Sequence, residues 1–337
     1  MNKLLTRDEF RDSVFARDKN TCVFCDKPAV DAHHIMERRL WPDSGYYLNN
    51  GASVCAEHHM KCESTEISLQ EVRDACGITK AILPPHLYDD QEYDKWGNII
   101  LPNGRRLKGE LFFDESVQKV IKNYLHLFTD WVKYPRTYHL PWSEGMHDDD
   151  RMMESLEAFE GKRVIVTEKM DGENSTLYRD YFHARSIDGR HHSSRDWVKG
   201  FWSQISSEIP EGWRICGENM YAKHSISYND LESYFYGFSI WNERNICLSW
   251  DETQEWFKLL EIISVPTLYD NIFNVDKIKR LWDPTNHNSI EGYVVRLAEE
   301  IPYSQFRNKV GKFVRKGHIM TTKHWMFGQP IERNLLR

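Results

Sequence analysis

The sequence predicts an α+β fold built on antiparallel sheet, preceded by a small module rich in cysteine and histidine. From Arg163 onward, segments with the composition of strands dominate, and two helical stretches near 194–208 and 251–263 separate them. Cysteine and histidine gather instead between Cys22 and His59. The predicted strand segments are RVIVTEK, STLYRDYFHARS, WRICGEN, YFYGFSIW, EGYVVR and VGKFVRK. Because 337 residues exceed the length of most single domains, two hydrophobic cores are expected.

Capping residues place two of the helices. Thr6 with Glu9 three residues later forms a capping-box pattern, which predicts a first helix from about Thr6 to Asp18. Ser249 and Glu252 repeat this pattern at the start of the second helical stretch of the sheet domain.

Turn signals set the expected organisation of the chain. Between 64 and 134, short helical patterns alternate with turns such as Pro102-Asn103-Gly104. We therefore expect the Cys/His module with its extension at 1–100, a connector at 101–132 and the sheet domain at 133–337.

Composition excludes several classes of protein. Hydrophobic residues make up 40% and aromatic residues 13% of the chain, which is ample for globular packing. No stretch approaches the roughly 18 apolar residues of a membrane span, so we expect a cytoplasmic protein of a bacterium or of a virus in its host. The seven cysteines are odd in number, and Cys22, Cys25 and Cys55 lie among histidines, which favours metal binding over disulfides.

Charge is distributed unevenly along the chain. The net charge is −7, yet residues 301–337 contain eight Lys or Arg against one acid, Glu332. This excess predicts that a polyanion docks at this end, and a solvated basic tail is the alternative. The acidic run 148–150 is expected to be a solvated loop without chemistry.

The string Glu168-Lys169-Met170-Asp171-Gly172-Glu173-Asn174 follows a predicted strand and contains a candidate nucleophile. Lys169 can attack phosphorus only as the free amine, so its pKa of roughly 10.4 has to be lowered by burial or a cationic neighbour, usually a metal ion. Asp171 and Glu173 could help to hold that metal. Gly172 would let the backbone approach a nucleotide closely.

Further motifs follow Lys169 in a fixed order. They are Arg185 in Ala-Arg-Ser, Glu218 in Gly-Glu-Asn, Phe238 in Tyr-Phe-Tyr-Gly-Phe-Ser, Glu291 in Glu-Gly-Tyr-Val-Val-Arg and Lys312 in Gly-Lys-Phe-Val-Arg-Lys. Over about 133–316 this series resembles the covalent nucleotidyltransferase superfamily, and most closely its RNA ligases. The resemblance implies an antiparallel-sheet adenylation domain that uses ATP and Mg2+ or Mn2+ to join RNA ends.

The same resemblance implies roles for the residues of the nucleotide site. Lys169 would become adenylated, and Glu168 would read the adenine. Glu218 would bond the ribose, Phe238 would stack on the purine, and Glu291 would join Asp171 as a metal ligand.

Other residues would handle the phosphates. By the resemblance, Asn174 and Arg185 would engage the 5′-phosphate end of the RNA. Lys312, helped by Arg315 or Lys316, would bind the α-phosphate and stabilise the charge that develops there.

Two features depart from the family, and a third separates its branches. Ser239 replaces the usual Asp after the stacking aromatic, and Lys312 and Arg315 are three positions apart, so which cation faces the phosphate stays open. Only 21 residues follow Lys316, which is too short for the OB-fold domain that DNA ligases and capping enzymes need. This length favours an RNA ligase.

The Cys/His module contains two ligand pairs, Cys22-x2-Cys25 and Cys55-x2-His58, whose spacing predicts one tetrahedral Zn2+ site. Other polar residues lie inside this frame, and together they resemble the HNH nuclease family across about 21–61. They are His33-His34-Ile35, Asn49-Asn50-Gly51 and His59.

The HNH resemblance implies a ββα-metal unit. His34 would be the general base, His33 and His59 would hold a catalytic metal, and Asn50 would orient the base. Cys62 occupies the place where that family often has a lysine. Two alternatives stay open: the module cleaves RNA or DNA, or it only binds nucleic acid beside an RNA ligase domain. A zinc nucleic-acid protein with an inactive or DNA-directed ligase domain is the other hypothesis for the whole chain.

Overall fold

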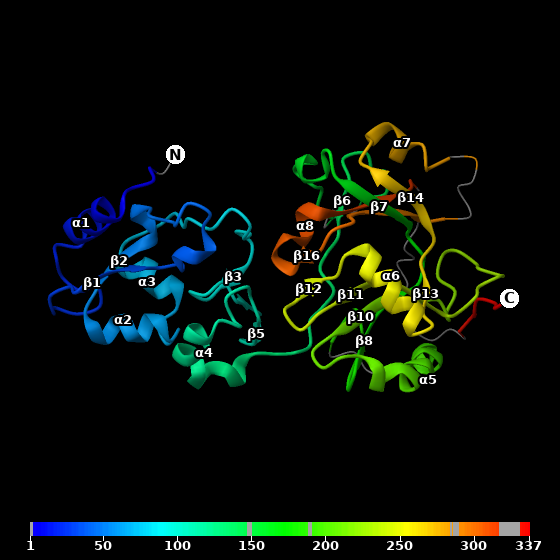
Figure 1. Cartoon of the computed structure of the whole chain (residues 1–337), viewed down its shortest axis with the longest axis horizontal. Coiled ribbons are helices and arrows are strands. Elements are labelled where there is room, and N and C mark those ends of the chain that lie inside the picture. The colour runs from blue at the N-terminus through cyan, green and yellow to red at the C-terminus, as the bar shows by residue number, and fades with distance from the viewer. Residues whose placement is uncertain (1–2, 147–149, 188–190, 284, 286–289, 317–330) are drawn as a thin grey trace. The chain divides into compact units, whose positions relative to one another are not determined.

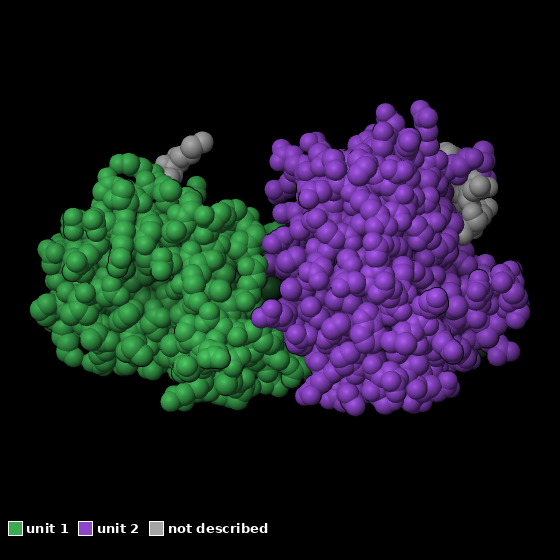
Figure 2. Space-filling view, in the orientation of Figure 1, with its two compact units in different colours: residues 1–130 green, residues 131–337 purple. Residues whose placement is uncertain are grey.

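The computed structural model describes residues 3–146, 150–187, 191–283, 285, 290–316 and 331–337, and its elements are labelled in Figure 1. The chain divides into two compact units, residues 1–130 and residues 131–337 (Figure 2). Each cluster of buried apolar side chains among the described residues draws on one unit only. Within the described residues, no helix has the length and apolar character of a membrane span.

The first unit begins with the predicted helix. Helix α1 (Arg7–Arg17) starts after Thr6, and both hydrogen bonds of the capping box with Glu9 are present, so this prediction is confirmed. Its buried Val14 packs on the small sheet formed by β1 (Asp31–His34) and β2 (Gly51–Val54). A Cβ at Gly51 would lie 2.4 Å from Val14 Cγ2, so glycine permits this close helix-to-strand packing.

The rest of the first unit surrounds this hairpin. Helix α2 (Ala56–Glu63) follows β2 directly, and α3 (Leu69–Ala75) comes next. A three-stranded antiparallel sheet and α4 (Glu115–Ile121) complete the unit. The strands of this sheet are β3 (Glu92–Tyr93), β4 (Ile99–Ile100) and β5 (Arg106–Leu107).

The second unit contains two sheets whose described strands pair mostly antiparallel, which confirms the predicted sheet type. The larger sheet has the order β16-β12-β11-β10-β8-β9, with β13 beside β11, and the smaller has the order β14-β7-β15-β17-β6. The larger sheet comprises β8 (Glu173–Tyr178), β9 (Phe182–Ala184), β10 (Arg214–Asn219), β11 (Phe235–Trp241), β12 (Ile246–Cys247), β13 (Ile263–Ser264) and β16 (Ile301–Pro302). The smaller comprises β6 (Tyr138–His139), β7 (Arg163–Glu168), β14 (Thr267–Ile272), β15 (Gly292–Leu297) and β17 (Val310–Val314).

Each predicted strand segment overlaps at least one of these strands. The segment STLYRDYFHARS forms two, because the chain turns at Arg179-Asp180 and β8 and β9 pair as a hairpin. The sequence patterns did not indicate β6, which pairs parallel with β17, or the exposed strand β14.

The two sheets and two helices form layers. One core cluster combines β10 and β11 of the larger sheet with β7, β15 and β17 of the smaller sheet. On the other face of the larger sheet, a second cluster holds α5 (Asp196–Ile205) and α6 (Trp250–Leu259). The predicted capping box of α6 is present between Ser249 and Glu252. This layering buries one face of each element, as a stable α+β domain requires.

Candidate functional site

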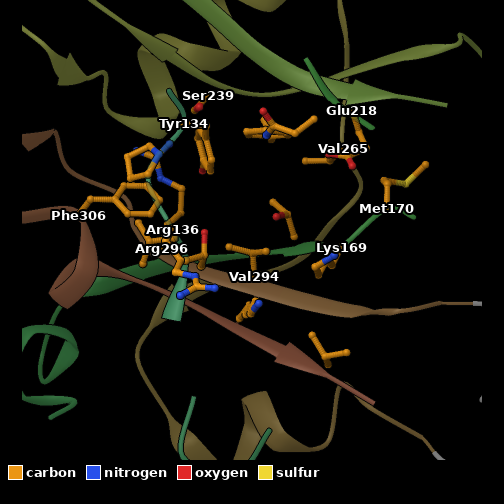
Figure 3. A pocket seen from close by; sticks show the side chains of 18 of the residues that line it. Tyr134, Arg136, Lys169, Met170, Glu218, Ser239, Val265, Val294, Arg296 and Phe306 are labelled. Atoms are coloured by element: carbon orange, nitrogen blue, oxygen red, sulfur yellow. The ribbon is translucent and has the colours of Figure 1, made fainter. Parts of the chain in front are cut away.

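A cavity of about 470 Å³ lies in the second unit and is lined by strands of both sheets (Figure 3). Its walls bring together most of the residues that the sequence singled out in this unit. These lining residues are Glu168, Lys169, Asn174, Arg185, Glu218, Phe238, Glu291 and Lys312. Residues more than 140 positions apart in the sequence therefore share one site.

Lys169 directly follows β7, and its backbone N–H donates to Gly292 O at the start of β15. Its Nζ lies 2.5 Å from Glu291 Oε2. Burial acts to lower the pKa of Lys169, but the carboxylates of Glu291 and Glu218 outweigh it and raise the pKa overall. The requirement for a free amine is therefore not met by burial, and a proton has to leave Lys169 before it can attack.

The turn after Lys169 is tightly packed. A Cβ at Gly172 would lie 2.6 Å from Asn219 O and 2.9 Å from Glu218 Cγ, so only glycine lets this turn approach the end of β10. Asp171 is buried, and its Oδ2 accepts hydrogen bonds from the backbone N–H groups of Ser225 and Ile226. The Asp171 carboxylate thus holds the loop at 225–226 in place. Asp171, which the resemblance made a metal ligand, is not among the residues that line the cavity.

Glu173 lies near this turn and pairs with a cation. Both its carboxylate oxygens accept from the guanidinium of Arg195, which is buried. This ion pair anchors the start of β8 to the helical segment before α5.

Carboxyl groups enclose one end of the cavity. Glu218 and Asn174 are direct neighbours on β10 and β8. Burial raises the pKa of Glu218 to about 8 and that of Glu168 to about 7. The buried Oδ1 of Asn174 accepts no hydrogen bond from a described residue. This unsatisfied acceptor, with the carboxylates of Glu218 and Glu291, offers the oxygen ligands that Mg2+ or Mn2+ prefers, so the residues present fit such a metal.

Aromatic and apolar side chains form the other end of the cavity. Phe238 on β11 meets the ring of Tyr134 edge to face, and Val294 on β15 also lines the wall. Ser239 is buried and accepts a hydrogen bond from Trp241 Nε1, so its hydroxyl is used within the larger sheet. These surfaces suit a planar base better than a charged group.

Lys312 on β17 lies at the cavity, whereas Arg315 follows the end of that strand and donates to Ile290 O. Strand alternation explains the difference, because Lys312 shares its face of β17 with Val310 and Val314, which also line the cavity. Burial lowers the pKa of Lys312.

Asp150 and His139 are site residues that the sequence patterns did not reveal. Asp150 lies 3.4 Å from Lys312 Nζ and 3.2 Å from His139 Nε2, and all three line the cavity. The run 148–150 was expected to be solvated, which is wrong for Asp150, while 148 and 149 lie outside the described residues. Only the two-residue parallel pairing of β6 with β17 brings His139 beside Lys312.

The basic excess of residues 301–337 is partly offset by acids from elsewhere. Lys309 lies 3.3 Å from Glu299, and Arg337 lies 3.1 Å from Asp230. Lys323, a further member of this basic set, lies outside the described residues. These acids therefore neutralise part of the net positive charge of residues 301–337, and a polyanion would meet less positive charge than the sequence indicates.

In the first unit, the four predicted zinc ligands converge. The described ligand atoms of Cys22, Cys25, Cys55 and His58 lie within 4.8 Å of one another. Cys25 Sγ is 3.9 Å from Cys55 Sγ, and His58 Nδ1 is 3.2–3.6 Å from the three sulfurs. In a tetrahedral site with Zn–S of about 2.3 Å and Zn–N of about 2.0 Å, ligand atoms are separated by about 3.5–3.8 Å. The residues therefore fit a zinc ion.

A second cluster joins His33 on β1 with His59 and Glu63 on α2. Glu63 Oε1 lies 3.4 Å from His33 Nδ1 and 3.3 Å from His59 Nε2. The sequence patterns did not reveal Glu63, although its position four residues after His59 places both on one helix face. The buried Lys95 lies 3.2 Å from Glu63 and donates to His34 O, so this ammonium also belongs to the cluster. Burial lowers the pKa of His33 to about 3.

His34 and Asn50 lie apart from that cluster. The His34 ring stacks on Phe10 of α1 with centroids 4.6 Å apart, and burial lowers its pKa to about 4. The Asn50 side chain is buried and bonds only backbone atoms among the described residues, accepting from Met36 N and donating to Met36 O and Gly45 O. Asn50 therefore holds the loop between β1 and β2.

Residues 162–314 match the family model described as RNA ligase. This RNA ligase region runs from the start of β7 to the end of β17, so it contains Lys169, Glu218, Phe238, Glu291 and Lys312. The resemblance to RNA ligases drawn from the motifs is confirmed for this region.

Solved structures similar to the chain include three structures of two ligases. Naegleria gruberi RNA ligase with PPi has 15% sequence identity, covers 81% of this chain and 72% of that chain, and has a TM-score of 0.40. A lysine-to-alanine mutant of the same ligase with ATP and Mn has 18% identity, covers 56% of this chain and 60% of that chain, and has a TM-score of 0.35. A putative ATP-dependent DNA ligase from Aquifex aeolicus has 18% identity, covers 55% of this chain and 50% of that chain, and has a TM-score of 0.38. In the last two comparisons the chain spans less than two thirds of the other protein. No curated protein matches the chain.

Proposed function

We propose that this protein is an ATP-dependent RNA ligase that joins 3′-hydroxyl and 5′-phosphate ends through an AMP bonded to Lys169. One observation carries the proposal: Lys169 shares a single cavity with Glu218, Phe238, Glu291 and Lys312 inside the RNA ligase region. These groups match the chemical needs of nucleotide transfer, namely a nucleophile, a base platform, metal-binding carboxylates and a cation for the phosphate.

In the first step, Lys169 Nζ attacks the α-phosphorus of ATP. The N–P bond forms as the bond to the leaving pyrophosphate oxygen breaks, and the amine proton passes to solvent. Mg2+ or Mn2+, held by Glu291, would neutralise phosphate charge and favour the free amine, and Glu218 would bond the ribose. Lys312 lines the same cavity, where its ammonium would stabilise the charge that develops on the α-phosphate oxygens.

The apolar end of the cavity is proposed to hold the adenine. Phe238 would stack on one face of the base, and Val294 would cover the other. Glu168 would recognise the base edge, and its pKa near 7 means that its carboxyl can serve as donor or acceptor around neutral pH.

The later steps would use the open side of the site. AMP passes from Lys169 to an RNA 5′-phosphate, and the 3′-hydroxyl oxygen of the second end then attacks that phosphorus and releases AMP. Arg185 is exposed and lines the cavity, as does Asn174. Both would bind the 5′-phosphate.

Incubation with ATP labelled at the α-phosphate, followed by denaturing electrophoresis, tests this proposal. Wild type with Mg2+ or Mn2+ should acquire a covalent label, prefer ATP to GTP, and lose the label in Lys169→Ala. Lys199→Ala is the matched control, because Lys199 lies on α5 and does not line the cavity. Label retained on Lys169→Ala would overturn the assignment.

For the first unit we propose one structural Zn2+ bound by Cys22, Cys25, Cys55 and His58, with the unit binding nucleic acid for the ligase. The second candidate is a nuclease, and the His33–His59–Glu63 cluster favours it because such a set can bind a divalent metal. In that candidate His34 is the proposed general base.

Cleavage assays on RNA and plasmid DNA with Mg2+ or Mn2+ separate the two roles. A nuclease should nick its substrate, and both His34→Ala and His59→Ala should lose that activity. A binding unit should show no cleavage in wild type, while deletion of residues 1–130 should weaken end joining more than lysine adenylation.

A further inference from the structure

The segment from Ile331 to Arg337 lies against the loop that connects β10 with β11. Its backbone N–H groups at Asn334 and Leu335 donate to Tyr221 O and Tyr228 O, and it receives a hydrogen bond from Lys223 N at Glu332 O. Leu335 and Leu336 remain largely exposed, so little apolar burial holds the segment in place. Its attachment depends instead on hydrogen bonds and on the ion pairs of Glu332 with Lys223 and of Arg337 with Asp230.

Asn334 is the centre of this attachment and is completely buried. Its Oδ1 accepts from Tyr228 N at 2.9 Å, and its Nδ2 donates to Met220 O at 2.8 Å. Its backbone carbonyl accepts from the Tyr234 hydroxyl at 2.8 Å. The Asn334 side chain thus ties Met220, at the start of the β10–β11 loop, to Tyr228 in the middle of the loop, and its backbone carbonyl bonds Tyr234 at the end.

Two short routes lead from Asn334 to the turn that carries Lys169. Through Tyr228, the route reaches Asp171, because the Tyr228 hydroxyl accepts from Asp171 N at 3.1 Å. Through Met220, it reaches Gly172, since a Cβ there would lie 2.7 Å from Met220 Sδ. Asn334 therefore contacts both residues that fix the turn after Lys169.

We propose that Asn334 is a positioning residue for Lys169, acting through Tyr228 and Met220 on the Asp171–Gly172 turn. This inference rests on the proposed function, because it concerns the attack of Lys169 on ATP. A small displacement of a nucleophile is costly, since misplacement by about 1 Å can slow a reaction by about a hundredfold. We call the hydrogen bonds of Asn334 with Tyr228 and Met220 the clamp. Loss of the clamp lets the Asp171–Gly172 turn shift while the cavity walls on β11 and β15 stay in place.

Three variants test the role of the clamp. Asn334→Asp keeps the acceptor for Tyr228 N but loses the hydrogen bond to Met220 O. Asn334→Ala loses both hydrogen bonds. Tyr228→Phe removes only the hydroxyl that accepts the hydrogen bond from Asp171 N. Leu335→Ala is the matched control, because this neighbouring side chain is 49% exposed.

Single-turnover adenylation at varied ATP should show slower maximal rates in all three variants, by about ten- to a hundredfold for Asn334→Ala, with the KM for ATP within about threefold of wild type. Leu335→Ala should react at the wild-type rate. Combining Asn334→Ala with Tyr228→Phe should slow the reaction less than the product of the single effects, because both act on one route. A wild-type maximal rate in folded Asn334→Ala would overturn the proposal.

Hydrogen exchange measured by mass spectrometry provides a readout that does not depend on catalysis. Amides of 169–173 and 220–228 should exchange faster in Asn334→Ala and remain protected in Leu335→Ala. If wild type forms no lysine adduct but this difference appears, the proposed function fails and the clamp stands. If adenylation proceeds but exchange at 169–173 is unchanged in Asn334→Ala, the clamp is refuted and the proposed function stands.

Discussion

The rings of Tyr134 and Phe238 meet edge to face, with centroids 5.1 Å apart and an angle of 72° between their planes. Tyr134 precedes the first strand of the second unit, and Phe238 lies on a central strand of its larger sheet. The contact orients Phe238 at the wall of the cavity and leaves a face that can support a base.

We expect Phe238→Ala to weaken ATP binding by about 1–3 kcal/mol, since stacking of a base on an aromatic ring has this magnitude. Equilibrium titration with a fluorescent ATP analogue measures the change. Tyr134→Phe keeps the ring contact and should bind as wild type does. Unchanged affinity in Phe238→Ala would show that the base lies elsewhere.

Removal of zinc should unfold about the first 60 residues and leave the second unit folded, because a segment this small has little core without its metal. Limited proteolysis and circular dichroism after chelation measure this, with zinc content determined by mass spectrometry. Cys25→Ser should lose the metal, whereas His34→Ala should retain it and leave lysine adenylation unchanged. Well-folded protein without zinc would refute the site.

The stability of the second unit should fall as the pH rises from about 5 to 8. Burial raises the pKa of Glu218 to about 8, so the folded chain keeps a proton that the unfolded chain releases above about 4.3. Glu218→Gln should flatten this slope by less than about 1.4 kcal/mol per pH unit, because the group is partly exposed. Denaturant unfolding at several pH values checks this, and the exposed Glu115→Gln should leave the slope unchanged.

Lys95→Met should destabilise the first unit by about 3–5 kcal/mol. The Lys95 ammonium lies 3.2 Å from Glu63 and 3.6 Å from Glu37. Its removal leaves Glu63 without this buried cation, whereas Glu37 keeps Arg39 at 3.0 Å. Lys27→Met removes an exposed pair with Glu57, so it should change stability by at most about 1 kcal/mol. Thermal unfolding compares the two variants, and equal effects would contradict the distinction.

RNA binding should weaken with salt, and Arg185→Ala should reduce the slope of log K against log salt by about one unit. Arg185 is exposed at the cavity, whereas Lys309 is already paired with Glu299. Lys309→Ala should therefore change the slope less than Arg185→Ala. Filter binding of 5′-phosphorylated RNA at several salt concentrations measures both, and an unaltered slope in Arg185→Ala would remove it from the phosphate site.

The sequence by itself determined the features that depend on near neighbours. The caps of α1 and α6 require residues three positions apart. The proposed zinc ligands likewise form two pairs, Cys22-x2-Cys25 and Cys55-x2-His58, whose members are close in the sequence. The strand segments could be predicted because burial of one core imposes a readable apolar pattern on each of them.

Only the tertiary structure decided which distant groups meet. Asp150 is a site residue because β6 pairs with β17 and the residues after Asp150 bridge to His139 on β6, which brings Asp150 to Lys312. The acidic run around Asp150 nevertheless has the composition of a solvated loop. Glu63 and Lys95 likewise join His33 across three separate elements. Asn334 acts on the turn after Lys169 through its hydrogen bonds to Tyr228 N and Met220 O. Because every residue has these backbone atoms, the sequence does not show which residues Asn334 contacts.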